Sequence, residues 1–207
     1  MRTFIYIDGF NFYYRAVKGT PYKWINFKSL FQKLLLPENQ IVKIKYFTAL
    51  VSGKYNPQKP IKQKTFIRAL ELTIPEIEVF YGHFLTHEVF APLAKPETNK
   101  KSVKIIKTEE KGSDVNIAVQ LLNDSWLNCF DCAVVVSNDS DLAEAMKLVK
   151  KHHPEKKLGL FMPGKGHPSK ELMQYADFIK RIREGVLLSS QLPNPIPGGN
   201  IYKPGNW

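Results

Sequence analysis

Four aspartates are the residues of this 207-residue chain that could most readily do chemistry. They are Asp8, Asp114, Asp139 and Asp141. Carboxylates contributed by separate segments can bind a divalent cation, and such a cation can promote hydrolysis. The motifs around them contain neither His nor Cys, so these oxygen donors suit Mg²⁺ or Mn²⁺ better than Zn²⁺.

Three of these aspartates lie where a predicted element begins or ends. Asp8 follows the apolar run Phe4 to Ile7, which is typical of a buried strand. Asp139 follows a similar run, Cys132 to Val136. Asp114 lies in the first turn of a predicted helix and shares its inward face with the apolar residues three, four, seven and eight positions later. The spacing therefore projects Asp114 toward the sheet.

Predicted strands and helices alternate along the chain. The strands are Phe4 to Ile7, Ile41 to Val51, Glu78 to Leu85, Cys132 to Val136, Leu158 to Met162 and Phe178 to Ile182. Helices are predicted after Asn26, over Ile61 to Leu72, from Ser113, after Asp141 and over Ser169 to Tyr175. Parallel strands need crossovers, which are usually helical, so we predict an α/β, doubly wound, mainly parallel, Rossmann-like sheet. Ligands bind beyond the carboxyl ends of such strands, where we expect the aspartates to meet.

Each aspartate also has a purely structural explanation. Asp139 or Asp141 alone could cap a helix, and Asp114 could complement a helix dipole. Asp8-Gly9 could be a simple turn. The coincidence of carboxylates from distant segments at one predicted edge favours the functional hypothesis. If they converge, mutual repulsion raises their pKa values unless a cation lies among them.

The composition points to a polyanionic partner. An excess of 30 Lys and Arg over 19 Asp and Glu gives a formal charge of +11, which favours nucleic acid, although basic charge can also serve solubility alone. The 43% hydrophobic content suits one globular domain. No signal-peptide pattern opens the chain, and no apolar run approaches the roughly 20 residues of a spanning helix. We therefore expect a cytoplasmic protein without a membrane partner, and structural roles for Cys129 and Cys132.

Two basic segments are candidates for holding a nucleic-acid strand. Pro92 to Lys101 lacks periodicity and is predicted to be a mobile loop, followed by a strand or hairpin arm over Val103 to Lys107. The second segment is the basic face of the helix predicted at Ile61. The cations are Lys95, Lys100, Lys101 and Lys104 in the first segment, and Lys59, Lys62, Lys64 and Arg68 in the second. Both segments would contact the phosphates of the nucleic-acid strand.

Three motifs together carry a resemblance to a known family. They are Ile7-Asp8-Gly9-Phe10-Asn11-Phe12-Tyr13, Glu110-Lys111-Gly112-Ser113-Asp114-Val115 and Val136-Ser137-Asn138-Asp139-Ser140-Asp141-Leu142. In this order they resemble the LabA-like branch of the NYN domain, within the PIN-like nuclease superfamily. The resemblance covers residues 1–183 and implies a three-layer PIN-like fold. Residues 184–207 remain as a helix remnant and a Pro/Gly-rich extended tail without a core of its own.

The resemblance also implies roles for individual residues. Asp8, Asp114 and Asp139 match the metal-site carboxylates, and Asp141 is expected to be a fourth. Asn11 and Ser137 match groups that orient a water or a phosphate oxygen, while Lys111 and Asn138 are expected to bind substrate. Many relatives have an acidic residue where this chain has Gln120, which leaves the number of metal ions open.

The implied activity is a Mg²⁺- or Mn²⁺-dependent ribonuclease, in which the cation lowers the pKa of a water that attacks phosphorus in line. A haloacid-dehalogenase-like phosphatase is disfavoured because Phe10 occupies the place of its second Asp. A non-catalytic module that binds RNA or protein on a nuclease-like fold stays open. No organic cofactor is expected, and a homodimer is compatible with the sequence. Tyr13, Tyr14 and Tyr55 could stack on bases, but we expect them to pack in the core.

Overall fold

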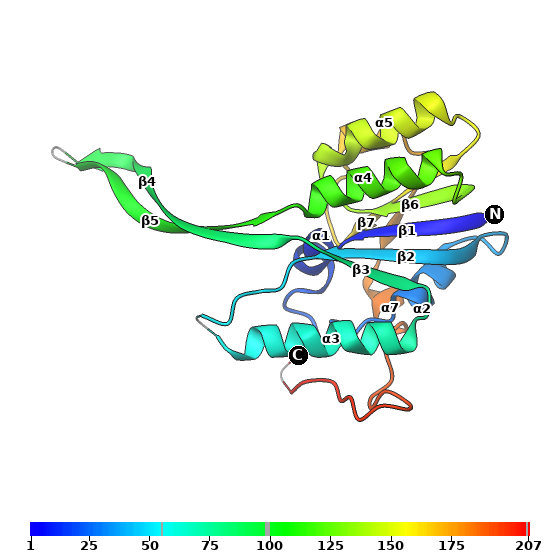
Figure 1. Cartoon of the computed structure of the whole chain (residues 1–207), viewed down its shortest axis with the longest axis horizontal. Helices are drawn as coiled ribbons and strands as arrows, with labels where there is room; N and C mark the ends of the chain where they lie inside the picture. Colours follow the sequence, from blue (N-terminus) through cyan, green and yellow to red (C-terminus); the bar gives the residue numbers. More distant parts are fainter. Residues whose placement is uncertain (55, 98–99, 206) are drawn as a thin grey trace.

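A computed structural model describes residues 1–54, 56–97, 100–205 and 207. Its main element is a six-stranded sheet of order β3-β2-β1-β6-β7-β8 (Figure 1). The strands are β1 (Arg2–Asp8), β2 (Gln40–Thr48), β3 (Ile77–Tyr81), β6 (Cys132–Val136), β7 (Lys157–Pro163) and β8 (Phe178–Ile182). All neighbouring strands of this sheet pair in parallel, which confirms the predicted α/β class.

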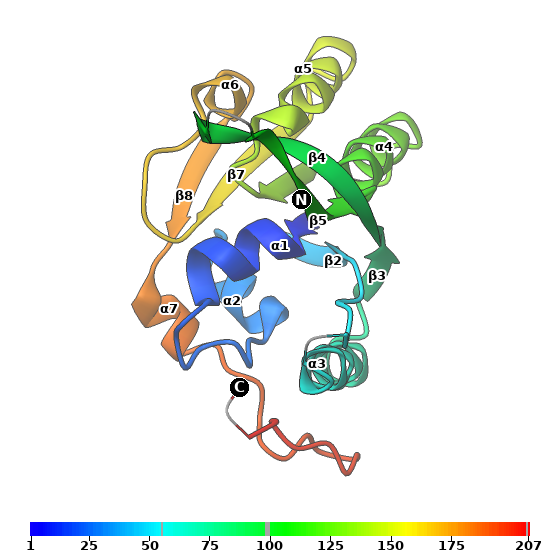
Figure 2. The ribbon, with the colours of Figure 1, turned by 90° about the vertical axis from the view of Figure 1, so that its left-hand side faces the viewer.

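Helices cover both faces of the sheet, as the doubly wound prediction requires. They are α1 (Gly9–Phe12), the π-helical η1 (Tyr13–Val17), α2 (Phe27–Leu34), α3 (Gln58–Thr73), α4 (Ser113–Trp126), the 3-10 helix η2 (Ser140–Leu142), α5 (Ala143–His152), α6 (Lys170–Met173) and α7 (Glu184–Leu188). Figure 2 shows α4, α5 and α6 on one face, and α1, α2, α3 and α7 on the other. The three layers enclose two separate cores.

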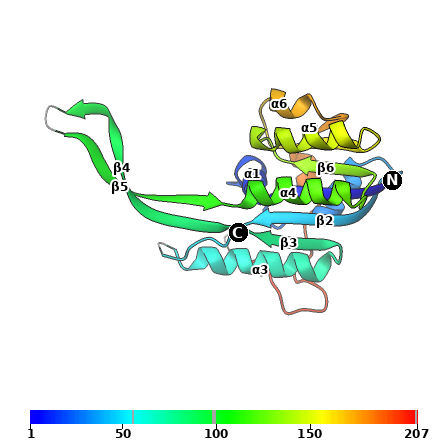
Figure 3. The same cartoon turned by 45° about the horizontal axis from the view of Figure 1, so that its top comes forward.

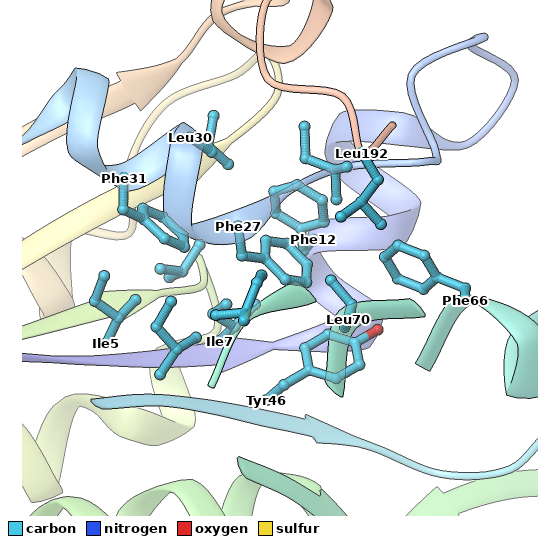
Figure 4. Close-up of a cluster of buried hydrophobic side chains, with 14 of the residues drawn as sticks. Ile5, Ile7, Phe12, Phe27, Leu30, Phe31, Tyr46, Phe66, Leu70 and Leu192 are labelled. Atoms are coloured by element: carbon cyan, nitrogen blue, oxygen red, sulfur yellow. The ribbon is translucent and has the colours of Figure 1, made fainter. Parts of the chain in front are cut away.

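The larger core lies under α1, α2 and α3 and is rich in aromatic side chains. Phe27 contacts Phe12, Phe31, Tyr46 and Phe66, with ring centroids 5.1 to 6.2 Å apart. Figure 4 shows these side chains between the helices and β1. Burying a side chain of this size stabilises the fold by about 1.5–3 kcal/mol. The helix after Asn26 forms as predicted, because the Asn26 side chain accepts the Ser29 N–H at 3.0 Å and caps it.

A two-stranded hairpin extends away from the sheet as a long arm (Figures 1 and 3). It pairs β4 (His83–Glu97) with β5 (Lys100–Lys111) in antiparallel register. The strand or hairpin arm predicted over Val103 to Lys107 is confirmed, but the mobile loop predicted over Pro92 to Lys101 is wrong. Both sides of that segment belong to paired strands, while residues 98 and 99 lie outside the described residues. Neither face of this hairpin is covered by a core, so apolar and polar residues need not alternate along its strands. The sequence therefore lacks the period-2 pattern that identifies a half-buried strand.

The segment after the family-like region packs onto the larger core. Leu192, Ile196 and Ile201 are buried there, and the Trp24 indole N–H donates to the Pro193 carbonyl at 3.1 Å. The apolar side chains of the Pro/Gly-rich tail thus belong to the larger core of the domain. The boundary at residue 183 stays a prediction.

Two smaller expectations concern the cysteines and membranes. Cys132 is buried at the start of β6, and burial raises the pKa of its thiol to about 11, which suits a structural residue. Neither cysteine forms a disulfide. Within the described ranges, none of the helices has the length and apolar character needed to cross a bilayer. The cytoplasmic location stays a prediction.

Candidate active site

The strand order reverses between β1 and β6. The chain runs outward from β1 to β2 and β3, returns to pair β6 with β1, and then continues outward on the other side. The crevice at such a switch point, beyond the carboxyl ends of the strands, is where open parallel sheets bind ligands. Asp8 is the last residue of β1, and Ser137 directly follows β6, so both lie at this point.

Asp8 is buried and held at both carboxylate oxygens. Oδ1 accepts the Asn11 N–H at 2.8 Å, which caps α1, and Oδ2 accepts the Ser137 hydroxyl at 2.9 Å. Burial raises the pKa of Asp8, the two hydrogen bonds lower it, and the negative charges of Asp139 and Glu110 raise it further. The net pKa is raised, so the neutral donors orient Asp8 without fully offsetting its burial.

Asn11, Ser137, Asn138 and Asp139 extend the network from Asp8. The Asn138 N–H donates to Asn11 Oδ1 at 3.1 Å, and the Asp139 N–H donates to Ser137 Oγ at 3.1 Å. The Asn138 side chain accepts the Ser169 N–H at 2.8 Å and donates to the His167 carbonyl at 3.1 Å. The loop after β6 is therefore anchored to β1 on one side and to the segment before α6 on the other.

Asp139 serves as a capping residue, and Asp141 lies within the short helix that it caps. The Asp139 side chain accepts the Asp141 N–H at 3.1 Å and caps η2, which is the structural explanation that the sequence left open. Capping uses one oxygen of Asp139 in this arrangement, and a second carboxylate oxygen remains for another partner. Asp141 itself is exposed. A capping role and a ligand role are thus compatible for Asp139.

The surroundings of Asp114 concern whether carboxylates from separate segments lie at one edge of the sheet. Its pKa is raised from 3.8 to about 6, first by burial and then by the negative charges of Asp8, Asp139, Glu110 and Asp141. The helix α4, whose first turn carries Asp114, contacts β1, which ends at Asp8, and η2, which Asp139 caps. The structure therefore brings the segments around residues 8, 114 and 139 to the same edge.

Glu110 is an acidic residue of the site that the sequence analysis did not single out. Its Oε1 accepts the Ser113 hydroxyl at 2.8 Å and the Ser113 N–H at 3.2 Å, at the start of α4. Gly112 between them has φ 98°, a left-handed conformation that favours glycine. The spacing Glu110-x-x-Ser113 before an apolar helix is the sequence signal that could have indicated this contact. It places the Glu110 carboxylate at the start of α4, beside Asp114.

The donor chemistry of this edge fits a divalent cation. The side chains around Asp114 supply only oxygen, and their shared negative charge is what a hard cation offsets. Within the described residues, however, no group of three or more His, Cys, Asp or Glu side chains is arranged to hold a metal ion as it stands. Mg²⁺ commonly uses only one or two carboxylates, with waters and substrate phosphates completing its shell, so it does not need such a cage. The roles of Asp8, Asp114, Asp139 and Asp141 as ligands stay predictions.

Two further residues of the resemblance, Lys111 and Gln120, make contacts with other side chains of the protein. Lys111 ends β5 and its Nζ lies 3.5 Å from Glu109, so its contact with a substrate stays a prediction. Gln120 accepts from buried Lys45 at 2.6 Å, and Lys45 also pairs with Asp124 at 2.7 Å. Gln120 thus belongs to a buried structural network of α4.

The expected core packing of the tyrosines after Asn11 is wrong. Tyr13 is 38% exposed and Tyr14 is 60% exposed, with their ring centroids 5.2 Å apart. They lie in η1, whose π-helical turn presents them to solvent near the switch point. Tyr55 lies outside the described residues.

An open parallel sheet with acidic side chains at its switch point defines an α/β protein with a candidate site at the carboxyl ends of its strands. Comparison with known sequences makes this specific, because a model of the NYN domain matches residues 2–183. The chain belongs to the NYN domain family, which is part of the PIN-like nuclease superfamily.

Individual proteins that are similar to this chain include a bacterial relative and a protein of known structure. One is 6-hydroxy-3-succinoylpyridine 3-monooxygenase HspA of Pseudomonas putida. The two sequences are 33% identical over an alignment 236 positions long, which covers all of this chain and 75% of the relative. The other is a crystal structure of a protein of unknown function from Vibrio parahaemolyticus, with a TM-score of 0.56 and 17% identity. That alignment covers 88% of this chain and 93% of the other, and it supports the fold alone.

Proposed function

We propose that this protein is a divalent-metal-dependent ribonuclease that hydrolyses phosphodiester bonds at the β1/β6 switch point. The observation that carries the proposal is the position of Asp8 at the β1/β6 switch point, where the Asn11 N–H and the Ser137 hydroxyl hold its two oxygens. Nearby carboxylates and burial raise the pKa of Asp114 to about 6, and the chain has a net charge of +11. Concentrated negative charge inside a basic protein suits a site where a cation meets a polyanion.

Asp8, Asp114, Asp139 and Asp141 are the residues that would hold Mg²⁺ or Mn²⁺. A bound divalent cation would supply a water of lowered pKa and offset the charge that builds on the phosphate oxygens. The chain's own groups supply orientation. The Asn11 N–H and the Ser137 hydroxyl hold both oxygens of Asp8, and the Asp141 N–H holds one oxygen of Asp139. The expected products carry 5′-phosphate and 3′-hydroxyl ends.

Basic side chains near the site would position the RNA backbone. α3 carries Lys59, Lys62, Lys64 and Arg68, and the arm carries Lys95, Lys101 and Lys104. The arm leads directly through Gly112 into α4 and therefore connects its cations to the segment that bears Asp114. Such contacts supply salt-dependent, sequence-independent affinity. Exposed Tyr13 and Tyr14 could stack on bases beside the carboxylates.

A fluorogenic RNA assay with added Mn²⁺ tests the proposal. We expect wild-type protein to cleave, Asp8→Asn to lose nearly all activity, and Glu71→Gln to keep the wild-type rate. Glu71 lies on the exposed side of α3, so this control removes the same charge outside the site. Equal rates for wild type and Asp8→Asn would mean a contaminating nuclease. Tight RNA binding without metal-dependent cleavage would favour the non-catalytic binding module.

A second candidate function is oxygenation of a small aromatic substrate. The whole of this chain aligns with a relative named as a monooxygenase of a substituted pyridine. A cavity beside Asp8, lined mainly by aromatic and lysine side chains, could accept a ring of that kind. Oxygen consumption and product formation with 6-hydroxy-3-succinoylpyridine and an electron donor would test it. Turnover there without RNA cleavage would replace the ribonuclease proposal.

A further inference from the structure

A cavity of about 300 Å³ opens on the α1 side of the sheet, next to the carboxylate edge. Its wall includes Gly9, the residue after Asp8, together with residues of η1, β2 and α3, and Trp207. The volume lies at the lower end of the range for small-molecule sites, about 300–1,000 Å³. It is therefore large enough for one ring system with its substituents.

Aromatic side chains form the inner wall of this cavity. Phe12, Phe27, Tyr46 and Phe66 belong both to its lining and to the larger core, so they are fixed by packing (Figure 4). Trp207 covers them, with its ring centroid 5.6 Å from that of Phe66. A rigid wall of aromatic faces and edges favours a planar aromatic guest.

Trp207 also leaves a hydrogen-bond donor without an acceptor. Within the described chain, its buried indole Nε1 has no hydrogen-bond partner. Buried donors are normally paired with protein or water. Because this nitrogen is buried, a guest in the cavity would contact the ring of Trp207 and not its N–H.

Lysines form the polar part of the lining. They are Lys18, Lys23, Lys59 and Lys62, and the lining residues that the structure describes include neither Asp nor Glu. Lys18 Nζ lies 4.6 Å from the ring centroid of exposed Tyr14, so one cation is already held over the aromatic rim. A small cavity lined by lysines, with no carboxylate among its described lining residues, favours an anionic guest.

We propose that this cavity binds a planar aromatic ring that carries a negatively charged group. The ring stacks within the aromatic wall that Trp207 covers, and its charge lies toward Lys18 and Lys59. A nucleotide of an RNA strand and a free aromatic carboxylate share this chemistry. Binding here does not depend on hydrolysis at the carboxylates, so it stands apart from the proposed ribonuclease activity.

The test uses matched probes that separate the contribution of the aromatic ring to binding from that of the negative charge. Isothermal titration in EDTA would compare pyridine-3-carboxylate with pyridine-3-carboxamide and with cyclohexanecarboxylate, and uridine 5′-monophosphate with uridine. We expect only the probes that are both aromatic and anionic to bind. Tighter binding of the nucleotide identifies RNA as the source of the guest, and tighter binding of pyridine-3-carboxylate identifies a free aromatic acid. Equal binding of the uncharged or non-aromatic partners, or no binding of any probe, would overturn the proposal.

Matched variants locate the binding. Lys59→Gln removes a lining cation of α3, whereas Lys151→Gln removes an exposed cation of α5 that does not line the cavity. Trp207→Ala removes the ring that covers the aromatic wall. We expect Lys59→Gln and Trp207→Ala each to weaken binding roughly fivefold, and Lys151→Gln to leave it unchanged. Equal loss in both lysine variants would mean non-specific attraction. Unfolding midpoints would confirm that each variant is folded.

Discussion

Asp114→Asn should stabilise the metal-free protein while it abolishes activity. The pKa of Asp114 is raised from 3.8 to about 6, because burial and the charges of Asp8, Asp139, Glu110 and Asp141 disfavour its ionised form. Each pKa unit corresponds to about 1.4 kcal/mol, so a shift of this size represents about 3 kcal/mol before screening. Asp114 is only half-buried, and solvent screening reduces the penalty to about 1.5 kcal/mol. Loss of its contact with the α4 dipole costs about 0.5 kcal/mol, which leaves a net gain of about 1 kcal/mol.

The sign of this effect depends on pH. A carboxyl group whose folded pKa exceeds its unfolded pKa destabilises the protein only when it is ionised. The penalty is therefore absent below pH 3.8, grows between pH 3.8 and about 6, and is complete above that. Asparagine has no such penalty, so Asp114→Asn should stabilise the protein at pH 8 and give no gain near pH 4.

Urea unfolding of wild type and Asp114→Asn in EDTA, at pH 8 and at pH 4.5, would measure the difference. Glu71→Gln serves as the control, since it removes one negative charge from an exposed helix position. Added Mn²⁺ should raise the stability of wild type and not that of Asp114→Asn, because only a site that binds the ion gains from it. A free-energy difference that is the same at both pH values, or a loss of stability at pH 8, would refute the reasoning.

Three further substitutions test the packing around the site. Lys45→Met leaves the Asp124 carboxylate buried without its cation and should cost about 3–5 kcal/mol in urea unfolding; a loss below about 1 kcal/mol would mean that the pair is hydrated. Gly9→Ala places a Cβ 2.5 Å from the Phe47 carbonyl oxygen and should lower stability by about 1–3 kcal/mol; unchanged stability would show that the turn can move. Ile196→Ala should cost about 2–5 kcal/mol, whereas a tail that does not pack on the core would show no change.

The carboxylate edge could be predicted because strong local patterns fix it. The run Cys132 to Val136 is too apolar for anything but a buried strand, and Ser137 to Asp141 must follow at its carboxyl end. The same argument places Asp8 at the end of β1. Parallel topology then places the carboxyl ends of β1 and β6 at the same edge of the sheet, and this can be inferred without knowledge of side-chain packing.

Other features depend on tertiary contacts that no local pattern reveals. α1 has only four residues and continues as a π-helical turn, so no helical period marks it; the Asp8 cap and the burial of Phe12 and Val17 stabilise it instead. None of the described side chains of β4 is fully buried, and Phe90 is 74% exposed, so the apolar residues of this strand need not follow the period of a half-buried sheet. Trp207 lies in a segment whose composition suggests only an extended tail, yet it covers a cavity beside β1.

One turn connects the two sites that this structure suggests. Asp8 faces the carboxylate network at the switch point, whereas the next residue, Gly9, lines the aromatic cavity and lies too close to β2 to accept a side chain. A single backbone conformation therefore positions both sites, and changes to the turn would damage both. Side-chain substitutions separate them, since Asp8→Asn leaves the cavity lining intact and Lys59→Gln leaves the carboxylates intact. If Lys59→Gln slows RNA cleavage while it weakens binding of uridine 5′-monophosphate, the cavity holds a nucleotide next to the bond that is cut. If cleavage is unchanged, the cavity serves a separate small aromatic anion.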